Sequence, residues 1–229
     1  MSVQAVILAA GMGTRLGKPW PKPLTPLSDG RTIMQQQMDN LSAAFEDVRV
    51  TTVVGFKLEM ILEQFPDVTY VYNENYDRTN TNRSLLKALR TSPAGGVLWM
   101  NGDVVFDPEV LRRAEPLMSA DESFICVNTA AVADEEVKYT VDDDGYVALL
   151  SKTVVGAMGE AVGINYVAAR DKAALVARLA ECDDMDYFER GVELMIATDG
   201  VRVRPLDITD LFAVEVDFED DLTRANSHL

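Results

Sequence analysis

The stretch Val6-Ile7-Leu8-Ala9-Ala10-Gly11-Met12-Gly13-Thr14-Arg15-Leu16-Gly17 carries an apolar strand directly into a glycine-rich loop. Glycines let the backbone approach a phosphate group closely, and the clustered N–H groups of such a loop can hold the anion. In open α/β sheets, ligands bind beyond the carboxyl ends of the strands, which is where this loop would lie. The junction therefore predicts an α/β fold with an anion-binding loop after its first strand.

Short apolar strands alternate with helical stretches through the first half of the chain. We expect strands at residues 3–9, 48–54, 68–72 and 96–100, and helices at residues 32–44, 57–64 and about 84–91. A further helix is expected after Asp107-Pro108, because an N-cap acid followed by proline favours a helix start. Repeated βα units with short connections predict an α/β protein with a doubly wound, mostly parallel sheet.

The second half of the chain is less regular. Two strands, 137–141 and 147–150, flank Asp142-Asp143-Asp144-Gly145, which favours a hairpin turn. We also expect strands at residues 161–168, 201–206 and 212–216, and helices at residues 172–180, 187–198 and 219–226. Since neither an internal repeat nor a low-complexity linker is present, the sequence predicts one domain over residues 1–229, with its second half laid over the carboxyl edge of the sheet.

Composition excludes several classes of protein. The 229 residues include 21 Lys+Arg and 37 Asp+Glu, a net charge of −16, which disfavours a nucleic-acid binder because phosphate backbones require a basic face. The single histidine, His228, is penultimate, so a Ser-His-Asp hydrolase or a His-rich zinc site is not expected. Cys126 and Cys182 form no CxxC pair and fit a reducing compartment. With no apolar stretch near the roughly 20 residues of a membrane helix, a cytoplasmic protein without membrane partners is expected.

Two familiar phosphate-binding loops do not fit the glycine-rich stretch. A dinucleotide-binding fingerprint that starts at Gly11 needs a small residue at the position of Leu16. This mismatch argues against an NAD-dependent reductase. A P-loop would need glycine at Met12 and serine or threonine at Pro19. Another nucleotide-binding loop is therefore indicated.

The segment Leu8-Ala9-Ala10-Gly11-x-Gly13-Thr14-Arg15-Leu16, followed by Pro21-Lys22-Pro23-Leu24, resembles the nucleotidyltransferases that activate sugar phosphates and alcohol phosphates. Residues 11–31 hold four cations against one acid, a local +3 in an acidic chain, although cations that simply face solvent would give the same count. The resemblance implies that Arg15 and Lys22 are catalytic. It also implies that the nucleotide is bound by Leu8, Ala9, Ala10, Gly11, Gly13, Thr14 and Arg15.

Carboxylates for a magnesium ion are expected in two places. In Met100-Asn101-Gly102-Asp103 an apolar strand ends at an acid, and the resemblance makes Asp103 a catalytic residue and the first Mg²⁺ ligand. The late motif Val214-Glu215-Val216-Asp217 resembles the family's second metal segment, which implies Asp217 as the second ligand and Glu215 as a further candidate. The alternatives are a turn residue for Asp103 and a helix cap for Asp217.

The polar run from Asn73 to Leu85 bears on the choice of base. Amide and hydroxyl groups can pair with the edge of a base, and an asparagine-rich run entering Ser84-Leu85 is similar to phosphocholine, phosphonate and inositol-phosphate cytidylyltransferases. This resemblance implies a base pocket formed by Thr79, Asn80, Asn82 and Ser84. The alternative is that some of these residues only cap a helix.

Acceptor-binding residues are expected in the second half of the chain. Lys152 aligns with a lysine that meets the acceptor's phosphate in this family, and the resemblance places Glu160 and Tyr187 beside it. Four aromatic residues, Tyr139, Tyr166, Tyr187 and Phe188, could form a cage for a quaternary amine, with core packing as the alternative for at least two of them.

The resemblance implies the Rossmann-like nucleotide-diphospho-sugar transferase fold with a small acceptor-binding β insertion. Residues 1–130 would form the nucleotide-binding half, and residues 131–229 the acceptor-binding half with the second metal carboxylate. The implied reaction condenses CTP with a small phosphate or phosphonate, with Mg²⁺ as cofactor. Alternatives are a sugar-1-phosphate or inositol-phosphate nucleotidyltransferase using UTP, TTP, GTP or CTP, and a non-catalytic nucleotide sensor. The sequence leaves open whether the chain forms a homodimer.

Overall fold

The apolar run at residues 3–9 forms β1 (Ser2–Ala9), around which the rest of the sheet is arranged. The computed structural model describes residues 2–130 and 136–229. On its two sides β1 pairs in parallel with β2 (Asp47–Val54) and β4 (Val97–Asn101). A parallel strand covered on both faces needs apolar side chains at successive positions, which explains why this run does not alternate.

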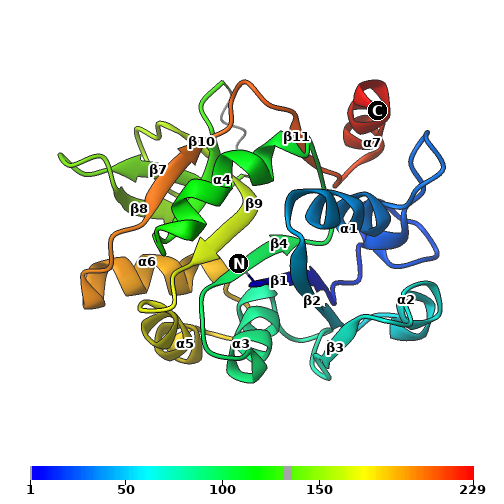
Figure 1. Ribbon diagram of the computed structural model, residues 1–229, viewed down its shortest axis with the longest axis horizontal. Coiled ribbons are helices and arrows are strands. Elements are labelled where there is room, and N and C mark those ends of the chain that lie inside the picture. The colour runs from blue at the N-terminus through cyan, green and yellow to red at the C-terminus, as the bar shows by residue number, and fades with distance from the viewer. Residues whose placement is uncertain (1, 131–135) are drawn as a thin grey trace.

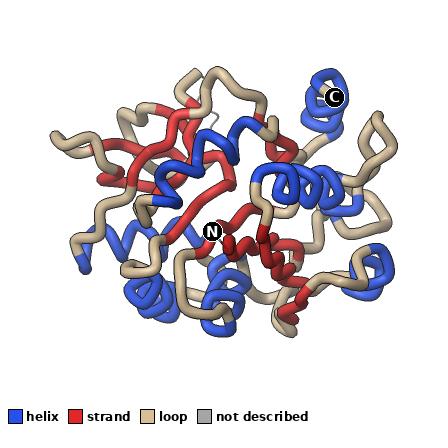
Figure 2. The backbone as a smooth tube through the Cα atoms, in the orientation of Figure 1, coloured by secondary structure: helices blue, strands red, loops and turns tan. Residues whose placement is uncertain are grey.

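The main sheet has the strand order β10-β6-β9-β4-β1-β2-β3 and runs through the middle of the molecule between the helices (Figure 2). Neighbours along this order pair in parallel, except that β9 is antiparallel to both β4 and β6. The remaining strands of this sheet are β3 (Thr69–Tyr72), β6 (Phe124–Asn128), β7 (Lys138–Val141), β8 (Val147–Ser151), β9 (Gly159–Val167) and β10 (Arg204–Asp207).

Helices cover both faces of the sheet, so the doubly wound arrangement is confirmed (Figure 1). Alternate side chains of β1 point to opposite faces: Ile7 joins the core under α1, α2 and α4, whereas Val6 joins the core under α3, α5 and α6. The helices are α1 (Ile33–Ala44), α2 (Leu58–Gln64), α3 (Thr81–Thr91), α4 (Glu109–Ser119), α5 (Lys172–Glu181) and α6 (Phe188–Asp199). None of the helices in the described ranges is long and apolar enough to cross a membrane.

A separate two-stranded ribbon joins the end of the chain to the glycine-rich loop. It pairs β5 (Val104–Phe106) in antiparallel fashion with β11 (Ala213–Glu215), and α7 (Glu219–His228) follows. Leu16 of the loop packs in a small core with Val105, Val214 and Ala225. The carboxyl-terminal segment is thereby held beside the first loop of the chain.

Part of the second half of the chain extends the sheet itself, which the expectation that it lies over the carboxyl edge did not include. Strand β9 pairs with β4 and β6, and β10 pairs with β6. The predicted hairpin is confirmed as β7 and β8, and Gly145 takes up the positive φ of its turn (+82°). This hairpin lies off the main strand order and attaches to β9.

Candidate active site

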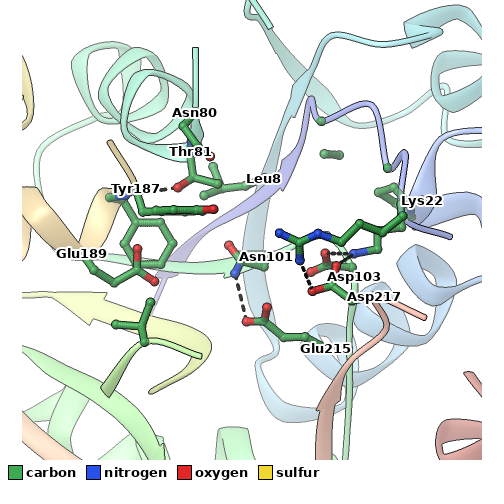
Figure 3. A pocket seen from close by; sticks show the side chains of 18 of the residues that line it. Leu8, Lys22, Asn80, Thr81, Asn101, Asp103, Tyr187, Glu189, Glu215 and Asp217 are labelled. Carbon is green, nitrogen blue, oxygen red and sulfur yellow. Dashed lines mark hydrogen bonds and ion pairs between the residues drawn. The ribbon is translucent and has the colours of Figure 1, made fainter. Parts of the chain in front are cut away.

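A cavity of about 280 Å³ opens beyond the carboxyl ends of β1 and β4. Most of the residues that the sequence singled out come together in its wall, although they are spread over more than 200 positions. Those that line it are Leu8, Ala9, Gly11, Gly13, Thr14, Arg15, Lys22, Asn80, Asp103, Lys152, Tyr187, Glu215 and Asp217. The Lys22 side and the Tyr187 side face each other across the cavity (Figure 3).

The two halves of the glycine-loop motif are in contact. Gly13 has a φ of +59°, and a Cβ added there would lie 3.1 Å from Cβ of Lys22. Glycine therefore serves two purposes at this position: it allows the left-handed backbone, and it lets the loop fold back onto the Pro21–Leu24 segment. This return brings the side chain of Lys22 into the cavity.

The ammonium group of Lys22 lies between two carboxylates (Figure 3). Nζ is 2.7 Å from Oδ2 of Asp103 and 2.5 Å from Oδ1 of Asp217, and the side chain is 10% exposed. Burial opposes the charge, but the two carboxylates outweigh it and raise the pKa of Lys22 to about 12. Burial likewise opposes ionisation of Asp217, yet Lys22 and Arg15, whose Nη1 lies 2.7 Å from Oδ2, lower its pKa.

The ribbon of β5 and β11 places these two carboxylates together. Glu215 pairs with Val104, and the backbone N–H of Val216 donates to the carbonyl oxygen of Asp103 at 2.9 Å. Asp217 then projects toward Lys22 and is not the cap of α7, since Asp221 accepts the backbone N–H groups of Asp217 and Phe218. The helix-cap alternative for Asp217 is therefore wrong.

The oxygen donors at this point fit a magnesium ion. Oδ1 of Asp103 is buried and has no hydrogen-bond partner among the described residues, and carboxylate oxygen is the donor that Mg²⁺ prefers. Glu215 differs: it accepts a hydrogen bond from Asn101 at 3.1 Å, and burial, followed by Asp103 and Glu136, raises its pKa well above the usual value. Within residues 2–130 and 136–229, no group of three acids, histidines or cysteines is arranged to hold a metal. Asp103, Asp217 and Glu215 all stay predictions as metal ligands.

A smaller cavity of about 60 Å³ adjoins the first and contains several of the predicted base contacts. Thr79, Asn80, Ser84 and Ala10 line it, together with Leu8 and Gly11. Sequence reasoning missed three of its residues, Asn73, Tyr76 and Thr81. Asn73 is buried and donates to Oγ1 of Thr79 and Oγ of Ser84, both at 3.1 Å, so it organises the hydroxyl groups of the cavity. Its position directly after β3 was the available signal.

The asparagine-rich run also has a structural function: it caps α3, which was the stated alternative, and it holds a distant segment, which the sequence did not predict. Nδ2 of Asn82 donates to the carbonyl oxygen of Asp183 at 2.6 Å, and Nη2 of Arg83 donates to that of Cys182 at 2.7 Å. Asn80 caps α3 and reaches the carbonyl oxygen of Met185. Asn82 is fully buried and lines neither cavity, which corrects its expected role as a base contact: its amide group holds the segment between α5 and α6.

At the acceptor end, Nζ of Lys152 lies 4.5 Å from the centre of the Tyr187 ring. Glu160, on β9 opposite Lys138, does not line either cavity. The four-membered aromatic cage is not formed, because the side chains of two members are used elsewhere. Tyr139 packs in the core, and Tyr166 stacks on Phe124 with 5.7 Å between ring centres. Glu136 and Glu189 line this end instead, and sequence reasoning missed both.

Comparison with known proteins gives a family model for residues 5–184, described as the MobA-like NTP transferase domain. The chain is 30% identical to CMP-5'-(3-aminopropyl)phosphonate synthase of Streptomyces rubellomurinus over 98% of its own length, but it spans 38% of that protein. It is 27% identical to 2-aminoethylphosphonate cytidylyltransferase of Lancefieldella rimae, covering 90% of this chain and 82% of that one.

Solved structures show the same fold at low sequence identity. The inositol-1-phosphate CTP transferase of T. maritima gives a TM-score of 0.79 at 17% identity over 99% of this chain and 95% of that chain. The CTP:phosphocholine cytidylyltransferase of Streptococcus pneumoniae gives 0.78 at 18% identity over 100% and 99%. The predicted nucleotide-diphospho-sugar transferase fold is thereby confirmed.

Proposed function

The chain belongs to the MobA-like NTP transferase domain family, and from this membership and the geometry of the cavity we propose that it is a cytidylyltransferase. It transfers CMP from CTP to a small phosphate or phosphonate acceptor and releases pyrophosphate, in a magnesium-dependent reaction. The observation that carries the proposal is the arrangement of Lys22, Asp103 and Asp217 beside the glycine-rich loop. The two relatives named for phosphonate activation support the choice of acceptor.

In the proposed reaction, an acceptor oxygen attacks the α-phosphorus of CTP, and the bond to the β-phosphate oxygen breaks. That acceptor oxygen is already ionised near pH 7, so no general base is needed. His228 fits this view because it stacks on Phe212, with 4.0 Å between ring centres, and does not line the cavity. Catalysis then consists of positioning the reactants and neutralising developing charge.

In the proposed reaction, each basic side chain that lines the cavity binds a different part of the substrates. Arg15 and the backbone N–H groups of residues 11–13 hold the β- and γ-phosphates, while Lys22 neutralises charge on the α-phosphate. Lys152 orients the acceptor's phosphate or phosphonate. Asp103 and Asp217 would hold Mg²⁺, which when bound supplies charge neutralisation at the phosphates. To reach the nucleotide, Arg15 and Lys22 give up part of their present contacts with Asp217.

Cytosine is proposed as the base because a cytidylyltransferase is among the similar proteins and the adjoining cavity of about 60 Å³ is polar. Asn73, Thr79 and Ser84 supply amide and hydroxyl groups there. Buried hydrogen-bonding groups of this kind discriminate strongly against a base that leaves them unpaired.

A pyrophosphate-release assay with Mg²⁺ tests the proposal, crossing the four ribonucleoside triphosphates and TTP against phosphonate, amino-alcohol phosphate and sugar 1-phosphate acceptors. We expect release with CTP and a phosphonate or small alcohol phosphate. Release with UTP or TTP and a sugar phosphate would keep the mechanism and overturn the base and acceptor. No release with any pair, with nucleotide still bound, would favour a non-catalytic sensor.

A further inference from the structure

Glu189 places a buried carboxyl oxygen, Oε2, at the predicted acceptor end of the cavity. The residue is 8% exposed, it lines the cavity, and its Oε2 is buried without a hydrogen-bond partner among the described residues. Figure 3 shows Glu189 on the same side of the cavity as Tyr187. A buried polar atom of this kind is costly unless a ligand satisfies it.

At the end of the cavity where Glu189 lies, carboxyl groups outnumber the basic side chain that faces them. Glu136 lines the same end of the cavity, and Lys152 is the cation that faces them, with its ammonium group over the ring of Tyr187. Among the described residues, no ion pair joins Lys152 to either acid within 4 Å. Two carboxyl groups against one lysine would repel an acceptor that carries only negative charge. They would attract one that brings a positive charge of its own.

A residue outside α6 fixes the first turn of this helix, and with it the position of Glu189. Glu189 is the second residue of α6, whose N-cap, Tyr187, makes no side-chain capping bond. Thr81 of α3 supplies that bond: its Oγ1 accepts the backbone N–H of Phe188 at 3.1 Å. Because Asn82 and Arg83 hold the preceding segment, Glu189 is tied to the helix that borders the base cavity.

We propose that Glu189, with Glu136 beside it, binds a primary ammonium group of the acceptor, so that the acceptor is an aminoalkyl phosphonate or phosphate. The inference rests on the proposed function. The acceptor is then a zwitterion, with its phosphonate oriented by Lys152 and its ammonium end at Glu189. Burial raises the pKa of Glu189 to about 7, which is consistent with a carboxyl group awaiting a cation.

A primary ammonium fits this end better than a quaternary one. The unpartnered Oε2 of Glu189 is a hydrogen-bond acceptor, and a trimethylammonium group has no N–H to donate. Recognition of quaternary amines relies instead on several aromatic faces. Here the face of Tyr187 already carries Lys152, and Tyr139 and Tyr166 do not line the cavity.

The test compares 2-aminoethylphosphonate with 2-hydroxyethylphosphonate and with the N-trimethyl form of the amine. With CTP and Mg²⁺, we expect the wild type to favour the primary amine over both in kcat/KM by at least about tenfold, the equivalent of about 1.4 kcal/mol. In Glu189→Gln, the ratio of kcat/KM for 2-aminoethylphosphonate to kcat/KM for 2-hydroxyethylphosphonate should fall to within about twofold of one. In Glu136→Gln, the same ratio should be smaller than in the wild type. Glu193→Gln, one turn further along α6 and ion-paired with Arg190, is the matched control and should keep the wild-type ratio.

Two results would overturn the proposal: no preference for the amine in the wild type, or an undiminished preference in Glu189→Gln. Equal use of the primary and trimethyl amines would overturn the choice of a primary ammonium. If no acceptor is turned over, the proposed function fails, and calorimetric binding of the same three compounds in the presence of CTP still tests the ammonium site. A binding preference for the amine that disappears in Glu189→Gln would then support the site alone.

Discussion

The ammonium group of Lys22 lies 2.5 Å from the carboxylate of Asp217, a residue 195 positions later in the chain. The same group binds Asp103, so one lysine joins the first loop of the protein to both predicted metal ligands. Without nucleotide, Lys22 is therefore the countercharge that keeps the two carboxylates together. A magnesium ion bound by these carboxylates would compete with that contact, and the ammonium would become available to the α-phosphate.

Replacing Lys22 should have opposite effects on turnover and on metal binding. We expect Lys22→Ala to lower kcat by at least about 100-fold, in line with the loss of a transition-state charge contact. Arg15 would still pair with Asp217, but no cation would bridge Asp217 to Asp103, so the variant should unfold at a lower temperature in EDTA and regain stability with Mg²⁺. Thermal unfolding with and without Mg²⁺ measures this.

Lys18→Ala is the control for that experiment. Lys18 lies in the same loop and pairs with Glu219, but it does not line the cavity. Its loss should leave both kcat and the response to Mg²⁺ close to the wild type. A Lys22→Ala protein that responds to Mg²⁺ no more than Lys18→Ala would contradict the shared-site interpretation.

Asp103→Asn should abolish the metal site while leaving the ribbon of β5 and β11 in place. The asparagine keeps the backbone carbonyl that accepts the N–H of Val216, but it replaces the buried, unpartnered Oδ1 and removes the charge. We expect turnover to fall by at least about 100-fold. Mn²⁺ binding in the presence of CTP, followed by electron paramagnetic resonance, should be lost as well. Asp143→Asn, in the exposed hairpin turn, should retain both, and retained Mn²⁺ binding in Asp103→Asn would exclude this residue as a ligand.

Much of this fold follows from local sequence patterns, and the parts that do not are those set by long-range pairing. The βα units and the β7–β8 hairpin were predicted because apolar runs and turn residues mark them. Strands β5 and β6 were not predicted. Strand β6 has only four apolar residues before Asn128 and no glycine or proline beside it, and β5 has three residues. The antiparallel direction of β9 depends on its partners β4 and β6, which its own residues do not specify.

In the candidate site, too, some residues could be identified from the sequence and others could not. Motif residues such as Arg15, Lys22 and Asp103 could be selected because the resemblance fixes their spacing, and the structure brings them together, though their catalytic roles stay predictions. Glu189 was missed because an acid in the first turn of a helix is an ordinary stabilising feature. Asn82 was misassigned because an asparagine beside a base pocket and one that binds a distant carbonyl look alike in sequence.

Asn82→Ala should weaken acceptor binding more than nucleotide binding. Its amide satisfies the carbonyl oxygen of Asp183, and loss of a buried hydrogen bond of this kind costs about 1–3 kcal/mol of stability. The segment leading to Tyr187 would loosen, so we expect KM for the acceptor to rise several-fold while KM for CTP changes little. Steady-state kinetics with each substrate varied in turn separates the two. Arg90→Ala, on an exposed position of α3, should change neither, and equal effects on both substrates would argue against a positioning role.

Glu189→Gln should make the protein more stable at neutral and alkaline pH. Burial, opposed by Lys152 and reinforced by Glu136, raises the pKa of Glu189 from its usual 4.5 to about 7, so the folded state favours the protonated form. This stabilisation is complete below pH 4.5 and is lost as the pH rises through about 7, at a cost of at most about 3 kcal/mol in the free energy of unfolding.

Glutamine does not titrate, so the stability gained by Glu189→Gln should grow between pH 5 and 7 and level off above it. Urea unfolding at several pH values measures this difference in the free energy of unfolding. A difference independent of pH would mean that Glu189 is not desolvated in the folded protein. The expected result would show that ionised Glu189 destabilises the folded protein, and an ammonium group bound to the ionised carboxylate would offset that cost.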